Sequence, residues 1–235
     1  MSRRQRARAV RWAVVVILAA TGLGLLGWQM GGTSGDTPGE ADMGESSVQN
    51  ENLSEAIFAG GCFWCIEAAF QNMPGVAEAI SGYTGGSVEN PTYRQVSTGT
   101  TGHVEAVLVR FDPSEIAYEE LLDQFWRSID PTDPEGQFYD RGSQYATAIF
   151  YLDEEQRDLA EASKQALEDS GVFDDPIVTA ILPAQPFYVA EDFHQDYFEK
   201  YLNQYKTYSA ASGRDAFLEE TWEEGQEEPE DSAED

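Results

Sequence analysis

Residues 56–70 read AIFAGGCFWCIEAAF, and this stretch decides the fold around it. Its first four residues are apolar and prone to form a strand, its two glycines predict a tight turn, and the residues from Ile66 onward are typical of a helix. Cys62 is therefore expected at the start of a helix. The free N–H groups and partial positive charge of a helix N-terminus favour an ionised sulfur, so the pattern predicts a reactive thiolate at Cys62. The alternative is a buried, unreactive cysteine, which is common for this residue type.

Cys62 and Cys65 are the only cysteines in the chain. A disulfide across so short a loop would add little stability, and a Cys-x-x-Cys pair is more often redox-active or metal-binding. A zinc site would need two more ligands, and the only histidines, His103 and His194, stand apart in the sequence, so no metal is expected. Residues three apart share a helix face, so Cys65 can condense with a sulfenic acid on Cys62 and resolve it as a disulfide.

The composition bounds both the size of the folded part and its partners. The chain has 235 residues, 41% of them hydrophobic, which fits one domain of ordinary size with appendages. The formal charge is −29, and residues 31–214 alone carry 32 acidic and 9 basic side chains. Because nucleic-acid binding depends on neutralising phosphates with basic residues, this charge excludes a nucleic-acid partner.

The two ends of the chain differ from its middle. Five arginines precede an apolar run without charge from Trp12 to Met30, so residues 1–30 are expected to be a single-pass membrane anchor that leaves the rest of the chain outside the cytoplasm. A cleaved signal peptide, giving a secreted or periplasmic protein, is the alternative. Residues 31–52 predict a flexible acidic linker, residues 53–208 a folded domain, and residues 209–235 a disordered acidic tail.

Hydrophobic periodicity gives the order of elements within the domain. The expected strands span 55–59, 76–83, 103–111, 144–151 and 177–182, and the expected helices span 63–72, 114–128, 153–170 and 191–204. The order β-α-β-β-α-β with extra helices predicts the α+β class, as a ferredoxin-like two-layer sandwich with a mostly antiparallel mixed sheet and flanking helices. The domain is expected to be a monomer.

Three side chains near the cysteines have two interpretations each. Phe63 and Trp64 are core aromatics by default, but rings beside a nucleophile can also form a pocket for a methyl group or a sulfur atom. Alternation along the expected strand can point Glu105 inward, but the default expectation for a strand carboxylate is a solvent-exposed position. If Glu105 is buried among apolar groups instead, its pKa rises and it can hold a proton to donate.

Several motifs occur together in the order and spacing of a known family. They are Gly61-Cys62-Phe63-Trp64, Gly82-Tyr83-Thr84-Gly85-Gly86, Asn90-Pro91-Thr92-Tyr93, Gly102-His103-Val104-Glu105-Ala106-Val107, Tyr139-Asp140-Arg141-Gly142-Ser143-Gln144-Tyr145 and Glu191-Asp192-Phe193-His194-Gln195-Asp196-Tyr197. In these motifs the chain resembles peptide methionine sulfoxide reductase A over residues 55–208.

The resemblance implies an enzyme that reduces methionine-(S)-sulfoxide, in oxidised proteins or as the free amino acid, without metal or organic cofactor. It implies Cys62 as the nucleophile and Glu105 as the buried acid that protonates the sulfoxide oxygen. Tyr93 and Tyr145 correspond to the tyrosines that hydrogen-bond that oxygen. The methyl pocket corresponds to Phe63 and Trp64, and a further polar position to Asp140.

The recycling cysteines are where the chain departs from the pattern. Many members have glycine at the position of Cys65 and keep recycling cysteines elsewhere, whereas this chain has serine at Ser97 and no cysteine in its tail. Either Cys65 resolves the sulfenic acid, giving a disulfide reduced by a thioredoxin-like protein, or an external thiol acts directly. A structural hydrogen-bonding role is expected for His194.

Two other classes of protein fit the cysteine pair. One is a general thiol–disulfide oxidoreductase, and the other is a surface-anchored binding module in which Cys62 and Cys65 form a permanent bridge. Neither requires Glu105 or paired tyrosines around an apolar pocket.

Overall fold

The computed structural model describes residues 52–222. The expected anchor, residues 31–51 of the expected linker and residues 223–235 of the expected tail lie outside these residues. Within them, no helix is both long and apolar enough to cross a membrane.

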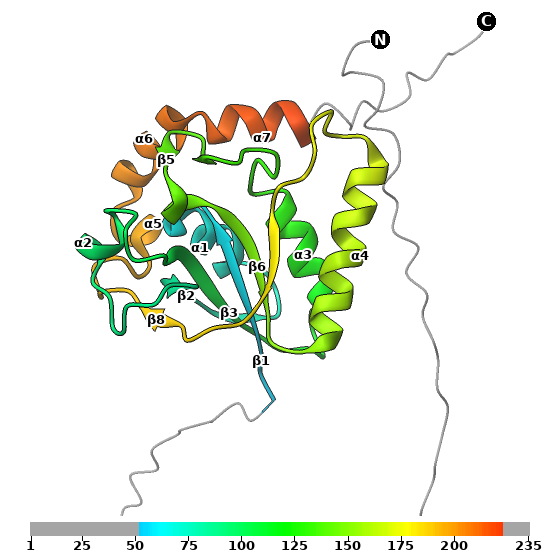
Figure 1. Cartoon of the computed structure of the whole chain (residues 1–235), viewed down its shortest axis with the longest axis horizontal. Helices are drawn as coiled ribbons and strands as arrows, with labels where there is room; N and C mark the ends of the chain where they lie inside the picture. The colour runs from blue at the N-terminus through cyan, green and yellow to red at the C-terminus, as the bar shows by residue number, and fades with distance from the viewer. Residues whose placement is uncertain (1–51, 223–235) are drawn as a thin grey trace, which may run out of the picture. The chain divides into compact units, whose positions relative to one another are not determined.

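A six-stranded sheet forms the centre of the domain, with the strand order β7-β6-β1-β3-β2-β8 (Figure 1). All neighbouring strands are antiparallel except β6 and β7, which are parallel. The expected mostly antiparallel mixed sheet is therefore confirmed. The strands are β1 Ser54–Gly60, β2 Val76–Thr84, β3 Val104–Phe111, β6 Thr147–Tyr151, β7 Ala180–Pro183 and β8 Tyr188–Val189. Two short strands, β4 Gly136–Gln137 and β5 Asp140–Arg141, pair separately.

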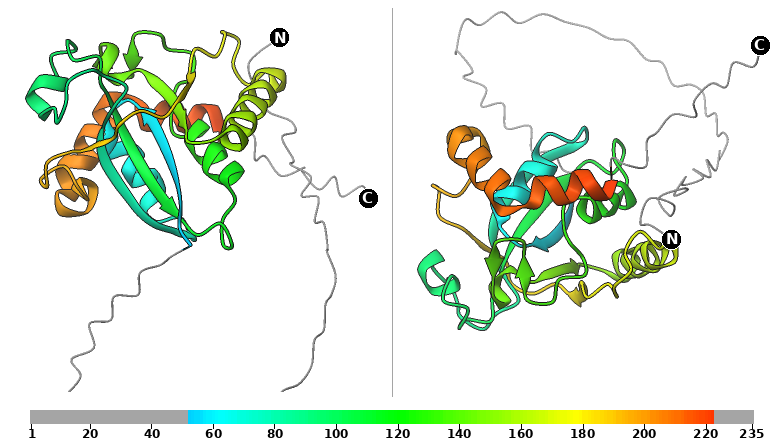
Figure 2. Two further views of the ribbon diagram at one scale, coloured as in Figure 1. Left: turned by 60° about the horizontal axis from the view of Figure 1, so that its bottom comes forward. Right: turned by 90° about the horizontal axis from the view of Figure 1, so that it is seen from above.

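Helices α1 and α3 pack against one face of this sheet through a cluster of aromatic rings. The ring of Phe58 in β1 stacks on Phe70 of α1 at 5.0 Å and on Phe125 of α3 at 5.1 Å between centroids. Helices α6 and α7 extend from beside α1 toward the end of α3 (Figure 2). The helices are α1 Phe63–Gln71, α2 Tyr93–Val96, α3 Tyr118–Trp126, α4 Glu154–Ser170, α5 Tyr197–Lys200, α6 Leu202–Ser212 and α7 Arg214–Trp222.

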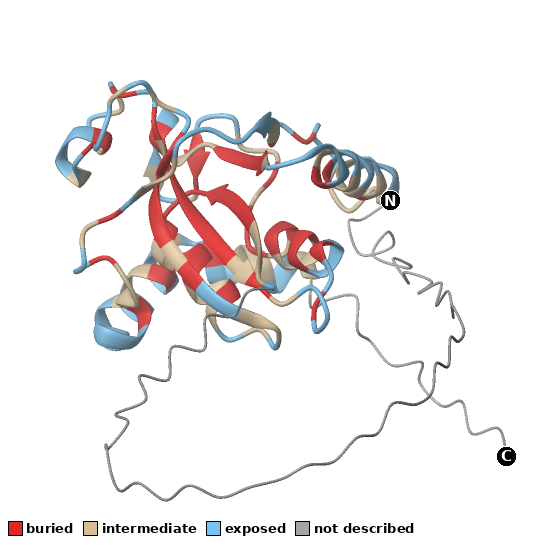
Figure 3. Ribbon diagram, turned by 90° about the horizontal axis from the view of Figure 1, so that it is seen from below, coloured by how far each residue is buried: buried red, intermediate tan, exposed pale blue. Residues whose placement is uncertain are grey.

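The opposite face of the sheet is apolar as well. A second cluster there contains Ile57, Ala106, Leu108 and Phe150, against which Phe187 packs. Buried residues consequently follow the central strands on both faces (Figure 3). A residue in the middle of β3 is buried whichever way it points, which simple alternation in the sequence does not reveal.

Some element boundaries differ from the expected ones for local reasons. The helix expected from Ser114 begins at Tyr118, because the carboxylate of Asp112 accepts from the N–H and hydroxyl of Ser114 at 2.8 and 2.6 Å and holds a turn there. The strand expected from 144 begins at Thr147, after the 3-10 turn η2 Ser143–Tyr145. The helix expected over 191–204 starts only after Asp196, whose φ is +53°.

The expected end of the domain at 208 is wrong, and so is the expected disorder of residues 209–222. Helix α6 continues to Ser212, and α7 follows after Gly213, whose φ of +86° ends α6. The ring of Phe217 in α7 contacts Phe138 at 5.4 Å and Phe173 at 6.4 Å. The acidic composition predicted a solvated tail, but these aromatic residues have distant partners that the local sequence does not show.

Candidate active site

Cys62 lies between β1 and α1, at the N-cap position of the helix, as expected. The turn requires glycine at Gly61, since its φ is +83° and a β-carbon there would lie 2.5 Å from the β-carbon of Gln137. The N–H of Cys65 donates to the carbonyl of Cys62 at 3.1 Å, which closes the first turn of α1. Both cysteines are free thiols and only 5% exposed. The turn therefore presents two buried thiols to the same region of the domain.

Glu105 points from β3 toward the start of α1 and is 2% exposed. Its carboxylate accepts from the backbone N–H of Phe63 at 3.1 Å. The exposed position expected by default is thus wrong, and the buried alternative is confirmed. Burial raises the pKa of Glu105 to about 8, against the lowering effect of the Phe63 N–H. At neutral pH this side chain is mostly protonated and can donate a proton.

The surroundings of the two thiols shift their pKa values in opposite directions. Burial, and then the hydrogen bond with Cys65, raises the pKa of Cys62. The same hydrogen bond, in which Cys62 is the donor, lowers the pKa of Cys65 to about 7. The expected low pKa of Cys62 is therefore not found. A physical reason is that Glu105 accepts from the N–H of Phe63, so this helix N-terminal donor is not available to the sulfur.

The two predicted tyrosines lie close to this centre. Tyr93 opens α2, and Tyr145 ends η2. Both phenols interact electrostatically with Glu105 and Cys62. Burial raises the pKa of Tyr93 to about 12 and also raises the pKa of Tyr145, so both hydroxyls remain hydrogen-bond donors at physiological pH.

Phe63 and Trp64 belong to a cluster of rings beside the thiols. The ring of Phe63 lies 6.4 Å from Tyr93 and 4.9 Å from His194. The indole of Trp64 stacks on Tyr197 at 3.8 Å, and its Nε1 donates to Nδ1 of His194 at 3.2 Å. His194 is thus a hydrogen-bond acceptor for Trp64, which agrees with the structural role expected for it. The rings give this side of the site an apolar wall.

Asp140 reaches the site from β5 and meets a residue that sequence reasoning missed. The hydroxyl of Tyr208 in α6 donates to Oδ2 of Asp140 and also forms a hydrogen bond with Cys62. Burial raises the pKa of Asp140. Tyr208 lies at the expected end of the domain. The regular spacing of Tyr201, Tyr205 and Tyr208 along one helical segment was the signal that could have found it.

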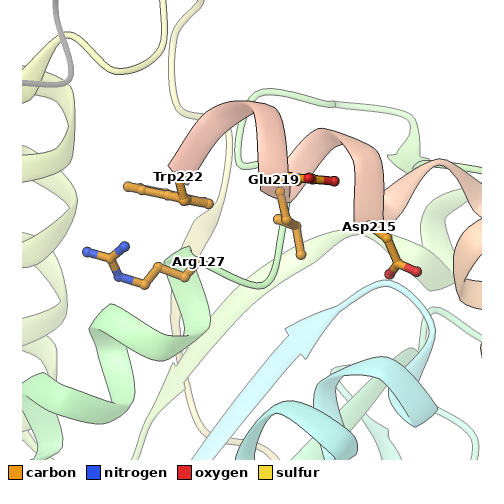
Figure 4. A pocket seen from close by; sticks show the side chains of 5 residues that line it. Arg127, Asp215, Glu219 and Trp222 are labelled. Atoms are coloured by element: carbon orange, nitrogen blue, oxygen red, sulfur yellow. The ribbon is translucent and has the colours of Figure 1, made fainter. Parts of the chain in front are cut away.

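Two other kinds of site are relevant within residues 52–222: a metal site and the pocket on α7. No group of three or more His, Cys, Asp or Glu side chains that could hold a metal ion occurs within residues 52–222. A pocket between α3 and α7, shown in Figure 4, contains none of the predicted site residues. Its lining consists of Arg127, Asp215, Leu218, Glu219 and Trp222.

The family model for peptide methionine sulfoxide reductase matches residues 54–226. The chain belongs to this family. Among curated members, peptide methionine sulfoxide reductase MsrA of Bacillus subtilis (strain 168) is 54% identical over 173 residues, which are 74% of this chain and 98% of that protein. The same enzyme of Halalkalibacterium halodurans is 55% identical over 172 residues, 73% of this chain and 98% of that protein.

A solved structure agrees with this membership. Methionine sulfoxide reductase A of Corynebacterium diphtheriae superimposes with a TM-score of 0.57 at 34% identity, covering 64% of this chain and 76% of that one. The matched residues 54–226 include α6 and α7, so the two C-terminal helices are part of the family domain.

Proposed function

We propose that this chain reduces the S epimer of methionine sulfoxide with Cys62 as the nucleophile and Cys65 as the resolving thiol. Reduction of methionine sulfoxide as such follows from the family. The residue roles are supported above all by one observation: the buried carboxyl of Glu105 accepts from the N–H of Phe63, the residue directly after Cys62, at 3.1 Å. An acid and a nucleophile are thereby held together in a site with little access to water.

In the first step a sulfoxide lies with its methyl group against Phe63 and Trp64 and its oxygen toward Tyr93 and Tyr145. A sulfoxide has a polar S=O beside an apolar methyl, so it needs donors on one side and rings on the other. The sulfur of Cys62 attacks the sulfoxide sulfur while Glu105 donates its proton to the oxygen; the sulfur–oxygen bond of the sulfoxide then breaks, and the oxygen passes to the sulfur of Cys62 as a hydroxyl group. Glu105 regains a proton that originates from the Cys62 thiol. The net result is methionine and a sulfenic acid on Cys62.

In the second step Cys65 attacks the sulfur of the sulfenic acid, which gives the Cys62–Cys65 disulfide and one water molecule. The two residues are one helical turn apart, and their thiols are already hydrogen-bonded to each other. A thioredoxin-like dithiol then returns both cysteines to thiols. Oxidised proteins and free methionine sulfoxide are the substrates, and no bound cofactor takes part.

Two cysteine variants test these roles. Cys62→Ser should form no methionine from a methionine sulfoxide peptide. Cys65→Ser should form one methionine per enzyme molecule and then stop when thioredoxin is the reductant. Full steady-state activity of Cys65→Ser with thioredoxin would remove Cys65 from the cycle.

The choice of epimer separates this function from its rivals. Separated S and R epimers of the same peptide should give turnover of the S epimer only. A general thiol–disulfide oxidoreductase would instead reduce insulin disulfides and leave both epimers unchanged. A protein with a permanent Cys62–Cys65 bridge would show no thiols in a titration before reduction.

The arrangement of the β6, β1, β3 and β2 strands supports a ferredoxin-like label for the domain. Taken in chain order, β1, β2, β3 and β6 are the four strands of a β-α-β-β-α-β unit, and α1 and α3 are its two helices. An experimental structure of residues 52–222 in which these four strands have another order would overturn the label.

The N-terminal region supports a location at the membrane. We propose that residues 1–30 anchor the protein, residues 31–52 act as a linker, and the catalytic domain faces away from the cytoplasm as a monomer. The five arginines before the uncharged run from Trp12 to Met30 carry this proposal. The protein should remain in the membrane pellet after carbonate extraction, whereas a chain starting at 31 should be released. Recovery of the full-length protein in the soluble fraction, cleaved near residue 30, would favour the signal peptide.

A further inference from the structure

Arg214, the first residue of α7, is a buried cation behind the cysteine turn. Arg214 is only 5% exposed to solvent. Its Nη2 donates to the carbonyl of Gly60 at 2.9 Å, and its Nη1 donates to the carbonyl of Ser128. The guanidinium carbon lies 4.6 Å from the centre of the Phe138 ring. Arg214 therefore joins the end of β1, two residues before Cys62, to the segments that follow α3 and β4.

Within residues 52–222, the positive charge of Arg214 is not neutralised by a direct ion pair. Its two side-chain hydrogen bonds within residues 52–222 go to neutral carbonyls, and none of the ion pairs formed among these residues includes this side chain. A cation that is removed from water favours a negative charge nearby. The environment of Arg214 thus stabilises an anion on a neighbouring group.

The charge of Arg214 acts to lower the pKa of three neighbouring groups, Asp140, Tyr205 and Cys65. The thiol among them that acts in the proposed cycle is Cys65. Groups on five elements interact with it, and in the part of the chain that the structure describes Arg214 is the one cation among them. They are Cys62 in α1, Glu105 in β3, Asp140 in β5, Tyr205 in α6, and Arg214 and Asp215 in α7. The hydrogen bond from Cys62 and the charge of Arg214 lower the pKa of Cys65, while burial, Asp140 and Asp215 raise it. The carboxylates oppose the ionised sulfur, so the cation is needed to offset them.

On the basis of the proposed function, we infer that Arg214 is a positioning residue with two roles. It fixes the Gly60-Gly61-Cys62 turn, and it holds Cys65 as the thiolate that attacks oxidised Cys62. The step it promotes is the second one. The thiolate of Cys65 forms a bond to the sulfur of Cys62, and the bond between that sulfur and its oxygen breaks. The oxygen leaves as hydroxide and takes one proton to become water. Cys62 is reduced from the sulfenic acid and Cys65 is oxidised from the thiolate, so the formal oxidation number of the Cys62 sulfur falls by one and that of the Cys65 sulfur rises by one.

The experiment measures both steps in the reduced full-length protein after one addition of a methionine sulfoxide peptide, without any external reductant. Quenched samples give methionine formed, which reports the first step, and loss of the second thiol, which reports the disulfide because the first thiol is already lost when the sulfenic acid forms. In the wild type the rate of disulfide formation should rise with pH as the Cys65 thiol ionises, with a midpoint set by its pKa in the oxidised enzyme. In Arg214→Gln the midpoint should rise by about one unit, and at pH values well below the wild-type midpoint disulfide formation should slow by about tenfold. Arg214→Lys keeps the charge and should keep the midpoint.

Arg127→Gln is the matched control. Arg127 follows α3, and its guanidinium lies 4.7 Å from the centre of the Trp222 ring at the pocket on α7 (Figure 4). This variant removes a cation that contacts α7 but does not contact the cysteine turn. The pH midpoint of its disulfide formation should equal that of the wild type.

Each outcome of this experiment either supports or overturns the inferred role of Arg214. An unchanged midpoint in Arg214→Gln overturns the inference. If near-UV circular dichroism shows that Arg214→Gln does not fold, Arg214→Lys decides instead: a wild-type midpoint supports the role of the charge, and a midpoint raised by one unit refutes it. Methionine formation by the wild type tests the proposed function separately, since its absence would remove the first step itself.

Discussion

Glu105 is the residue whose environment most directly predicts how the rate depends on pH. Burial raises the pKa of its carboxyl group to about 8. The proton is present below that pH and is lost as the pH rises through it. The single-turnover rate of methionine formation in the wild type should therefore fall above about pH 8. Glu105→Gln keeps the size of the side chain but removes the acidic proton, and should slow the first step by a factor of about 100 to 10,000.

Rapid-quench measurement of methionine formation across the neutral to alkaline range tests this expectation. Glu78→Gln is the matched control, because Glu78 lies on the exposed part of neighbouring β2 and pairs with Arg110 at 2.9 Å. A Glu105→Gln enzyme that forms methionine as fast as the wild type would show that the proton comes from another group.

Single residues also show where sequence reasoning reached its limit. Cys62, Phe63 and Trp64 could be placed correctly because a strand, a Gly-Gly turn and a helix follow one another in the chain. The orientation of Glu105 could not, because both faces of β3 are covered and alternation no longer separates inside from outside. Arg214 was missed because its partners, the carbonyls of Gly60 and Ser128, are distant in sequence and identical in kind to every other carbonyl.

At the scale of elements, Glu67 joins α1 to β2 and to the start of α5. Its carboxylate accepts from the hydroxyl of Ser81 at 2.5 Å and from the N–H of Asp196. Burial raises the pKa of Glu67 to about 7, well above the value of about 4.3 in an unfolded chain. Between these pH values the folded protein binds a proton that the unfolded chain has lost. The contribution of Glu67 to stability is thus fully present below about pH 4 and is lost as the pH rises to 7, by roughly 3 kcal/mol.

Glu67→Gln removes this titration. Urea unfolding of the wild type and the variant at several pH values between about 4 and 8 should show that the difference in their unfolding free energies changes with pH in favour of the variant as the pH rises. Glu55→Gln, an exposed carboxylate paired with Arg110 at 2.9 Å, serves as the control and should give a smaller change. Parallel stability curves for Glu67→Gln and the wild type would contradict the raised pKa.

The acidic composition of the sequence did not predict the end of α6 or helix α7. Ending the chain after Tyr208 removes α7 with Phe217 and Trp222, which contact the rings of Phe138 and Phe173. Aromatic pairs contribute about 0.5–1.5 kcal/mol each beyond area burial, so their loss should lower the melting temperature by roughly 10 °C. A chain ended after Trp222 keeps all three pairs and is the control. Equal melting temperatures of the two truncated proteins in a circular-dichroism scan would show that α7 does not stabilise the domain.

Elements with a clear period and end signal were predicted well for a physical reason. Helix α4 begins where the carboxylate of Asp153 accepts from the N–H of Gln156 at 2.8 Å, and ends at Gly171 with a φ of +64°. Both signals are local in the sequence. The end of the domain depends instead on contacts between α7 and residues far earlier in the chain. Local composition there favours disorder, and only the tertiary contacts reverse it.

At the scale of the whole molecule, charge is the dominant feature. The chain has 43 acidic and 14 basic side chains and a formal charge of −29, so most of its carboxylates have no basic side chain to balance them. Repulsion between like charges destabilises a compact state more than an expanded one, and salt shortens the range of this repulsion to about 8 Å at physiological ionic strength. Surface ion pairs, which salt weakens, contribute little.

Added sodium chloride should therefore raise the melting temperature of this protein, with most of the rise below about 0.5 M as the screening length becomes shorter than the spacing of surface charges. Circular-dichroism melting curves in the same buffer with increasing sodium chloride test this, and potassium chloride at equal ionic strength should give the same rise because screening depends on ionic strength rather than on the ion. Glu78→Lys, which reduces the negative charge by two at an exposed position, should lessen the dependence on salt slightly. A melting temperature that stays constant or falls with salt would show that the carboxylates are compensated within the fold, and that repulsion between them does not limit its stability.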